Sequence, residues 1–430
     1  MKVCIIGSSF ASAVISEKLS KLNINIDIVD IDKIDKQHQK KYLEIFKPNI
    51  LNVKKKEYQY HGWGGGSNVW HGVITKFDKS EINNYKNLGI NFNNIYKKFS
   101  KSSLSFIGVK SNFFQKNTIN KSKISLKCSE SDIFEDKFFL VQKKPFSTKN
   151  IFKKISKKKN VNLIENSCAI SFNFGNLKIN YLNIIDLKTK KVKKLYADIY
   201  ILCCGAIESP RVLLQSIAGN KYQYKNKYIG KGINDHYKGI IGKFNLNDEE
   251  NIFDIKLNDS EFSRVGFIPQ DKVFGNYCVI FRQAFDNSYI KLTNNIKKYL
   301  KELKFLNLAL VLKNLKLKNF IFLLKKFFFN KRPLIGVNAE IWIETETNNS
   351  NLIKLTNKKD KYGRYIPKIK FSLGKKEKNQ IIHAQKNLDR IFSLNNKKYF
   401  KSTFNLNNFS SGSHFSNTCR IGKDISNSVV

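Results

Sequence analysis

The first thirty residues show the clearest alternation of apolar and polar segments in the chain. An apolar run ends at Ile6, a stretch of small and helix-compatible residues follows, and a second apolar run over 26–29 ends at Asp30. A buried strand, a helix and a second buried strand in this order predict a βαβ unit of a parallel sheet. A βαβ unit of this kind can bind a dinucleotide or can be an ordinary part of an α/β domain.

The turn of this unit has the small residues that a dinucleotide requires. Gly7 permits the turn, and the small side chains of Ser9 and Ser12 let a pyrophosphate approach the backbone at the start of the helix, where free N–H groups face the phosphates. Asp30 would accept hydrogen bonds from the ribose hydroxyls. Because Ser9 and Ser12 replace two glycines of the usual G-x-G-x-x-G pattern, the motif alone leaves the ordinary α/β unit open.

A second unusual stretch, His-Gly-Trp-Gly-Gly-Gly-Ser-Asn-Val-Trp-His-Gly, spans 61–72. Consecutive glycines are costly to order, and they usually occur where backbone must come close to a ligand. We expect this loop to contact the flavin or nicotinamide end of the dinucleotide. A glycine-rich surface loop is the alternative.

The chain after the glycine-rich stretch predicts further strands and one more helix at the cofactor. The apolar strand over 199–204 runs into Gly205 and Ala206 and then a helix with Pro210 near its start, which places a second backbone turn beside the same pyrophosphate. Residues 79–149 are polar and helical in parts. Other strands are expected at 162–166, 177–181, 337–344 and 365–371.

Composition limits the class of protein. The net charge of +43 comes almost wholly from scattered lysines, and no recognition helix, zinc finger or RNA-binding signature is present, so we expect no specific nucleic-acid partner. Neither the 7 cysteines nor the 6 histidines have metal-site spacing. Since Met1 leads directly into the first strand, a cytoplasmic location is expected.

The segment 303–329 is apolar but studded with lysines. Its lysine-free stretches are shorter than the ~20 residues that a membrane span needs. A packed amphipathic helix is the preferred interpretation. A helix that covers the active site or lies on an anionic membrane surface is the alternative.

Four stretches together resemble the glucose-methanol-choline (GMC) family of FAD-dependent oxidoreductases, along nearly the whole chain. Residues 205–216 are similar to the second family signature and residues 65–72 to the first. Residues 229–236 are similar to the passage into the substrate lobe. Residues 411–422 resemble the C-terminal motif, in which a His, here His414, stands three residues before Gly-Thr-Cys; Asn417 replaces that Gly.

This resemblance implies an α/β fold: a Rossmann-like three-layer FAD-binding domain with an inserted α+β substrate domain. The strands expected at 337–344 and 365–371 would belong to the antiparallel sheet that floors the substrate cavity. The FAD-binding domain would be discontinuous and its C-terminal part incomplete. The expected ranges are 1–76, 152–236 and 409–430 for the FAD-binding domain, and 77–151 and 237–408 for the substrate-binding domain.

The resemblance also implies non-covalent FAD, because Val69 falls where covalently flavinylated members carry a histidine; His71 lies close by. Ala169 and its neighbours would contact the adenine side. The residues expected at the cofactor are Gly7, Ser8, Ser9, Phe10, Ala11, Asp30, Gly65, Gly66, Ser67, Asn68, Val69, Trp70, Ala169, Cys204 and Gly205.

By the same resemblance, His414 would be the base that takes the hydroxyl proton of an alcohol or sugar while hydride passes to flavin N5. An imidazole suits this role because it titrates near neutral pH. The electron acceptor is not identified by the sequence. The chain ends at Val430, before the passage in which the family carries a second catalytic His or Asn. Two alternatives remain. The missing passage favours a truncated, inactive remnant, and the apolar segment 303–329 favours a protein associated with a membrane surface.

Overall fold

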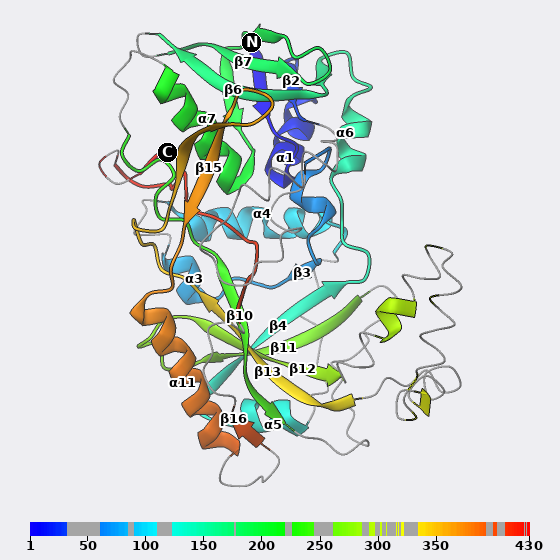
Figure 1. Cartoon of the computed structure of the whole chain (residues 1–430), viewed down its shortest axis with the longest axis vertical. Coiled ribbons are helices and arrows are strands. Elements are labelled where there is room, and N and C mark those ends of the chain that lie inside the picture. Colours follow the sequence, from blue (N-terminus) through cyan, green and yellow to red (C-terminus); the bar gives the residue numbers. More distant parts are fainter. Residues whose placement is uncertain are drawn as a thin grey trace.

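The computed structural model describes residues 1–31, 61–84, 90–109, 123–175, 178–219, 226–244, 261–285, 292–296, 334–392, 399–401 and 409–430 except 425 and 427, and a few positions between 302 and 321. The segment 32–60 lies outside the described residues, as does nearly all of the segment 303–329 predicted to be an amphipathic helix. Two lobes are stacked along the long axis of the molecule, one around a parallel sheet and one around a large antiparallel sheet (Figure 1).

The parallel sheet confirms the predicted βαβ unit. Its strand order is β5-β2-β1-β9, and all neighbours run parallel. This order is typical of doubly wound dinucleotide-binding sheets, with the first strand in the middle. The strands are β1 (Lys2–Ile6), β2 (Asn25–Val29), β5 (Val161–Ile164) and β9 (Ile199–Leu202).

Alternation along β1 builds the two outer layers. Val3 and Ile5 point to one face and pack under helices α1 and α6, whereas Cys4 and Ile6 point to the other face, toward β6, β7, β8 and α7. The result is the three-layer arrangement expected for the cofactor lobe. The elements are α1 (Phe10–Leu19), α6 (Lys149–Ile155), β6 (Ser167–Phe174), β7 (Ile179–Asp186), β8 (Val192–Leu195) and α7 (Gly205–Gly219).

The antiparallel sheet of the other lobe has the order β16-β10-β13-β12-β11-β4-β3, with β17 paired to β10. Helix α11 (Lys375–Phe392) covers one face, where Ile381 and Leu388 pack against Val337 and Ile341. The strands are β3 (Val73–Ile74), β4 (Phe134–Gln142), β10 (His236–Phe244), β11 (Glu261–Pro269), β12 (Tyr277–Phe285), β13 (Leu334–Glu344), β16 (Tyr399–Lys401) and β17 (Ser410–Ser411).

Residues 79–149 contain the expected helices but also a strand that the sequence reading did not anticipate. The helices are α3 (Lys79–Asn84), α4 (Phe92–Phe106) and α5 (Lys123–Ser129). Strand β4 follows them and pairs with β11 over its whole length. The sequence pattern does not predict this strand because Glu135, Asp136 and Lys137 interrupt the apolar residues at its beginning.

The strand expected at 365–371 exists, but its predicted place in the large sheet is wrong. Strand β15 (Tyr365–Lys370) pairs only with β14 (Leu352–Lys359) among the described strands, and this hairpin lies against α7 in the cofactor lobe (Figure 1). The range 237–408 expected for the substrate domain therefore includes a hairpin that packs on the other lobe. The alternation of apolar residues gave the strand but not its partner.

A buried cluster of four charges fixes this hairpin to α7. Arg211 of α7 contacts Glu208 at 3.3 Å and Asp360 at 3.1 Å, and Arg364 contacts the same two carboxylates at 3.3 and 2.8 Å. Burial alone would raise the pKa of Asp360, but the two guanidinium groups hold that pKa below its usual value. Because two cations and two anions share one site, each buried charge has a partner.

Helix α7 contains Pro210 at its sixth position, deeper than the start of the helix that the sequence suggested. A proline cannot donate to the carbonyl four residues earlier, which is that of Ala206. The hydroxyl of Thr418 donates to this carbonyl at 2.6 Å, and Thr418 is buried. The C-terminal segment therefore supplies the hydrogen bond that the helix lacks.

We expect Thr418→Val to lower the free energy of unfolding by about 0.5–1.5 kcal/mol, because it removes the hydroxyl that donates to the carbonyl of Ala206. In a Pro210→Ala background the new N–H can pair with Ala206, so the same change should cost less. Denaturant unfolding of the four members of this cycle measures the difference, with Thr418→Ser as the variant that keeps the hydroxyl. An equal cost in both backgrounds would contradict this account of the helix.

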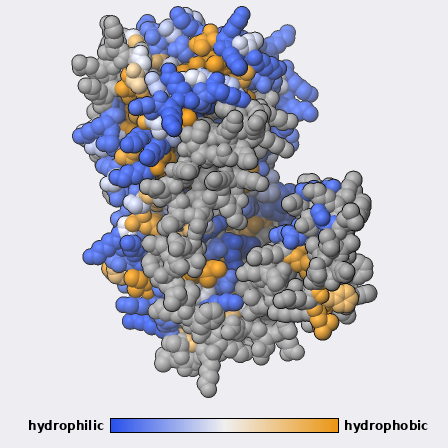
Figure 2. Space-filling view, viewed as in Figure 1, coloured by the Kyte–Doolittle hydropathy of each residue, from blue (hydrophilic) through white to orange (hydrophobic). Residues whose placement is uncertain are grey.

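The surface view in Figure 2 shows mainly hydrophilic residues on the coloured parts of the face in view, with smaller hydrophobic groups between them. In the part of the chain that the structure describes, every helix is too short or too polar to cross a membrane. All 7 cysteines carry free thiols, and four of them are buried.

Candidate cofactor and active site

Ser8 joins the two glycine-containing stretches that the sequence separates by fifty residues. Its hydroxyl donates to the carbonyl of Gly62 at 3.1 Å and accepts from the N–H of Gly64 at 3.1 Å. The loop then forms a short 3-10 helix, η1 (Gly65–Asn68). A Cβ at Gly65 would lie 3.3 Å from the carbonyl oxygen of Ser8, so the loop rests directly on the first turn.

The first turn has the geometry that a phosphate-binding turn needs. Gly7 has a φ of +93°, and a side chain there would meet the carbonyl of Cys203 at 2.8 Å. Ser9 is the N-cap of α1, and its hydroxyl accepts from the N–H of Ser12 at 3.4 Å. Gly7 thus lets β1, β9 and the start of α1 come together, and the N-terminus of α1 opens beside them.

The end of β9 forms a third wall of the site, beside the glycine loop and the first turn. The N–H of Cys203 donates to the carbonyl of Ile6 at 2.8 Å, and the thiol of Cys204 donates to the same oxygen at 3.1 Å. Gly205 follows with a φ of +74°, and no protein atom lies within 4 Å of the position of its missing Cβ. Backbone is therefore exposed here to open space.

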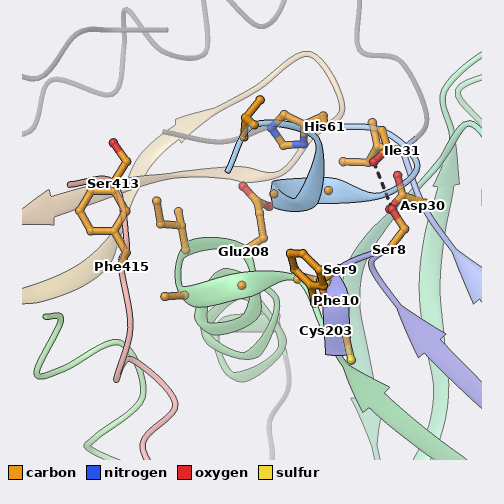
Figure 3. A pocket seen from close by; sticks show the side chains of 18 of the residues that line it. Ser8, Ser9, Phe10, Asp30, Ile31, His61, Cys203, Glu208, Ser413 and Phe415 are labelled. Atoms are coloured by element: carbon orange, nitrogen blue, oxygen red, sulfur yellow. Dashed lines mark hydrogen bonds between the residues drawn. The ribbon is translucent and has the colours of Figure 1, made fainter. Parts of the chain in front are cut away.

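One continuous cavity of about 810 Å³ connects these walls, within the range of ligand sites in proteins. Asp30 and Ser8 lie at one side of the close-up in Figure 3, whereas Ser413 and Phe415 lie at the other, with Glu208 of α7 between them. The predicted residues that line the cavity are Ser8, Ser9, Phe10, Asp30, Gly65, Gly66, Val69, Trp70, Ala169, Cys204, Gly205 and His414.

Four predicted cofactor residues do not line the cavity: Gly7, Ala11, Ser67 and Asn68. Gly7 shapes the turn, and Ala11 lies exposed on α1. The buried hydroxyl of Ser67 donates to the carbonyl of Gly64 at 2.5 Å, while the amide of Asn68 donates to backbone carbonyls of the same loop. The last two therefore hold the loop in shape.

Several residues that line the cavity are not among those predicted from the sequence. Glu208 lies inside the stretch that resembles the second family signature, so its position there was a usable signal. Arg364 and Cys168 come from the hairpin turn and from β6, and they meet at 2.6 Å between guanidinium and thiol. The sequence offered no signal for these two because only the packing of the hairpin on α7 brings them together. His61 and Lys238 also line the cavity.

The C-terminal motif is held along the start of β10. Asn234 and Ser416 exchange backbone hydrogen bonds at 3.2 and 3.1 Å, and Tyr237 pairs with Ser411. Between these contacts the backbone of Ser413 has a φ of +60°. Just after them, Asn417 stands at the position where the family has glycine and has a φ of +70°. Asn tolerates this left-handed conformation better than most residues, which explains why it can replace the glycine.

His414 is the imidazole that this loop presents to the cavity. Asp235, which is 3% exposed, accepts the backbone N–H of His414 at 2.9 Å and the hydroxyl of Ser411. Desolvation and the neighbouring His236 lower the pKa of His414 below its ordinary value; Lys238 also lowers this pKa, and Asp235 opposes the change. The ring is therefore neutral at neutral pH and can accept a proton.

The central region is similar to a known family. Residues 140–238, which include β5 to β9, α7 and the crossing into the large sheet, match the family model described as GMC oxidoreductase. Members of the GMC family are FAD-dependent oxidoreductases. No curated protein sequence matches the chain.

A solved structure supports the same fold. The crystal structure of pyridoxine 4-oxidase from Mesorbium loti matches with a TM-score of 0.57 and 11% sequence identity, covering 99% of this chain and 89% of that one. At this identity the likeness shows the fold alone. It extends over both lobes, so the two chains share the arrangement of a parallel-sheet lobe and an antiparallel-sheet lobe.

The residues present fit FAD. The cavity is long enough to reach from Asp30 at the end of β2 to His414 in the other lobe. Gly66 and Gly205 both line it, and no protein atom lies within 4 Å of either missing Cβ, so backbone can approach a ligand at two points. In the described part of the chain no group of His, Cys, Asp and Glu is arranged to hold a metal ion.

Proposed function

We propose that this chain is an FAD-dependent oxidoreductase that acts on the CH–OH group of an alcohol or sugar, with His414 as the base. The observation that carries the proposal is the single cavity that joins the dinucleotide-binding turn to an imidazole held by a buried carboxylate. The GMC family match supports the reaction class.

We assign the parts of the cofactor to the walls of the cavity. The start of α1 with Ser9 faces the pyrophosphate, and Asp30 accepts the ribose hydroxyls. Ala169 contacts the adenine side, and the loop that begins at Gly65, together with Gly205, contacts the rest. The bound flavin supplies the acceptor for the hydride that leaves the substrate carbon.

Two residues on the cavity wall bear on the mode of attachment. Val69 stands where covalently flavinylated relatives carry a histidine, and a valine side chain has no nucleophile. His71 lines the same cavity two residues later. We propose non-covalent FAD, which denaturation of the purified protein tests directly, since free flavin should separate from the chain.

His414 performs the acid–base part of the reaction. As a neutral imidazole it accepts the hydroxyl proton of the substrate and, as imidazolium, it stabilises the oxygen as negative charge develops. Asp235 fixes the backbone of His414 through the 2.9 Å hydrogen bond, so the fold sets the position from which the ring extends. Precise placement of this kind reduces the entropy that the reaction must lose.

The test is to purify the chain, load it with FAD and mix it anaerobically with a panel of primary alcohols, pyridine alcohols and sugars. We expect a yellow protein whose oxidised-flavin absorbance is lost with one class of alcohol. A folded protein that takes up FAD but is not reduced by any of these would fit the alternative of an inactive remnant. A folded protein that cannot bind FAD would overturn the proposal.

A further inference from the structure

A second imidazole lies against His414. His236 is the first residue of β10, and the centroids of the two rings are 5.5 Å apart with their planes at 84°. This is an edge-to-face arrangement, the geometry in which the edge of one ring meets the face of another. His236 is half-buried and is not one of the residues that line the cavity.

The backbone makes this pair a fixed feature of the fold. The N–H of Gly412 donates to the carbonyl of His236 at 2.6 Å, and a Cβ at Gly412 would lie 2.5 Å from the same oxygen. Asp235, the residue before His236, accepts the N–H of His414. Two adjacent residues of the crossing segment therefore bind both ends of the turn that carries His414.

We propose that His236 is a positioning residue for His414, holding the His414 ring edge-to-face in the orientation in which it faces the cavity. The proposal rests on the proposed function, because positioning matters only if His414 is the base. In this proposal the second imidazole of the active centre is that of His236, which belongs to the segment that crosses between the lobes and not to the C-terminal motif.

The pair has an electrostatic consequence as well. A proton on His236 opposes a proton on His414, so His236 lowers the pKa of His414. The charged and titratable groups that act on His414 are His236, Asp235, Lys238 and His71, and of these only Asp235 favours the protonated form. His236 thus helps to keep His414 in the form that can accept a proton.

Two variants separate the contributions of ring and charge. His236→Gln removes both. We therefore expect the titration midpoint of His414, followed by NMR in the FAD-loaded protein, to rise by on the order of 0.5 pH unit. We also expect kcat/KM at neutral pH to fall about tenfold. His236→Phe keeps a ring for the edge-to-face contact, so it should recover most of the lost rate at pH values where imidazoles are neutral. His383→Gln, on α11 and outside the cavity lining, is the matched control.

The outcomes are distinguishable. If the His414 midpoint and the rates are the same in the parent and both variants, the positioning role is wrong. If His236→Gln moves the His414 midpoint but the parent protein reduces no FAD with any alcohol, the pair exists and the proposed function fails. If His236→Gln does not fold, His236→Phe, which keeps a ring, decides through its rates and through the titration midpoint of His414.

Discussion

His414→Asn is expected to slow the reduction of bound FAD by substrate by about 10²–10⁴-fold, the usual contribution of a general base. The variant keeps a polar side chain of similar reach but has no group that accepts a proton near neutral pH. The FAD affinity should be unchanged, since the carboxylate of Asp235 holds residue 414 through its backbone N–H and not through its ring.

Rapid-mixing absorbance measurements on the FAD-loaded protein follow this reduction directly. His383→Gln should react at the parent rate, because this histidine lies on α11 and contacts Tyr277 instead of the cavity. A loss smaller than tenfold in His414→Asn would show that another group takes the proton.

The pH profile provides a second check on the same residue. Because the pKa of His414 is lowered, its neutral, proton-accepting form persists below the ordinary value of about 6.5. The rate of flavin reduction should therefore rise with pH through a midpoint below that value and be level above it. His414→Asn should lose this limb; a midpoint above 6.5 would contradict the electrostatics of the site.

Gly66→Leu is expected to weaken FAD binding by at least about 100-fold and to yield a colourless protein. No protein atom lies within 4 Å of the missing Cβ of Gly66, and its φ is not in the left-handed region, so leucine meets neither a protein contact nor backbone strain. Its side chain instead enters the cavity, where it occupies space that the cofactor needs.

The matched control is Gly219→Leu, at the exposed end of α7, where the missing Cβ is equally free of neighbours. Both variants should keep the melting temperature of the parent protein without FAD, and only Gly66→Leu should lose the stabilisation that added FAD gives. Thermal unfolding with and without FAD measures this. Equal stabilisation of the two variants would place the cofactor elsewhere.

Local pattern determined much of the cofactor lobe. The apolar run before Gly7, the acid at Asp30 and the strand that ends at Cys204 could be assigned because buried parallel strands are continuous apolar runs, and the ends of such strands meet at one edge of the sheet. The glycines of the loop, Gly65 and Gly66, could be assigned to a ligand because ordering them has a cost that packing alone does not explain.

Local pattern could not decide which segments meet across the lobes. The hairpin that carries Arg364 has the alternation of any strand, and only its packing on α7 shows that it belongs beside Glu208. Asn417 looks like a loss of the family's glycine in sequence, yet its backbone has a φ of +70°, a conformation that asparagine tolerates.

The sequence by itself determined the βαβ unit, since this unit depends on residues close together in the chain. The ligand contact of the glycine loop and the role of His414 stay predictions, the second of them from the family resemblance. Only the tertiary structure decided that Ser8 holds the glycine loop, that Thr418 completes α7 and that His236 meets His414. These contacts join residues that are far apart in sequence, and hydrogen bonds and ring contacts of this kind leave no periodic pattern along the chain.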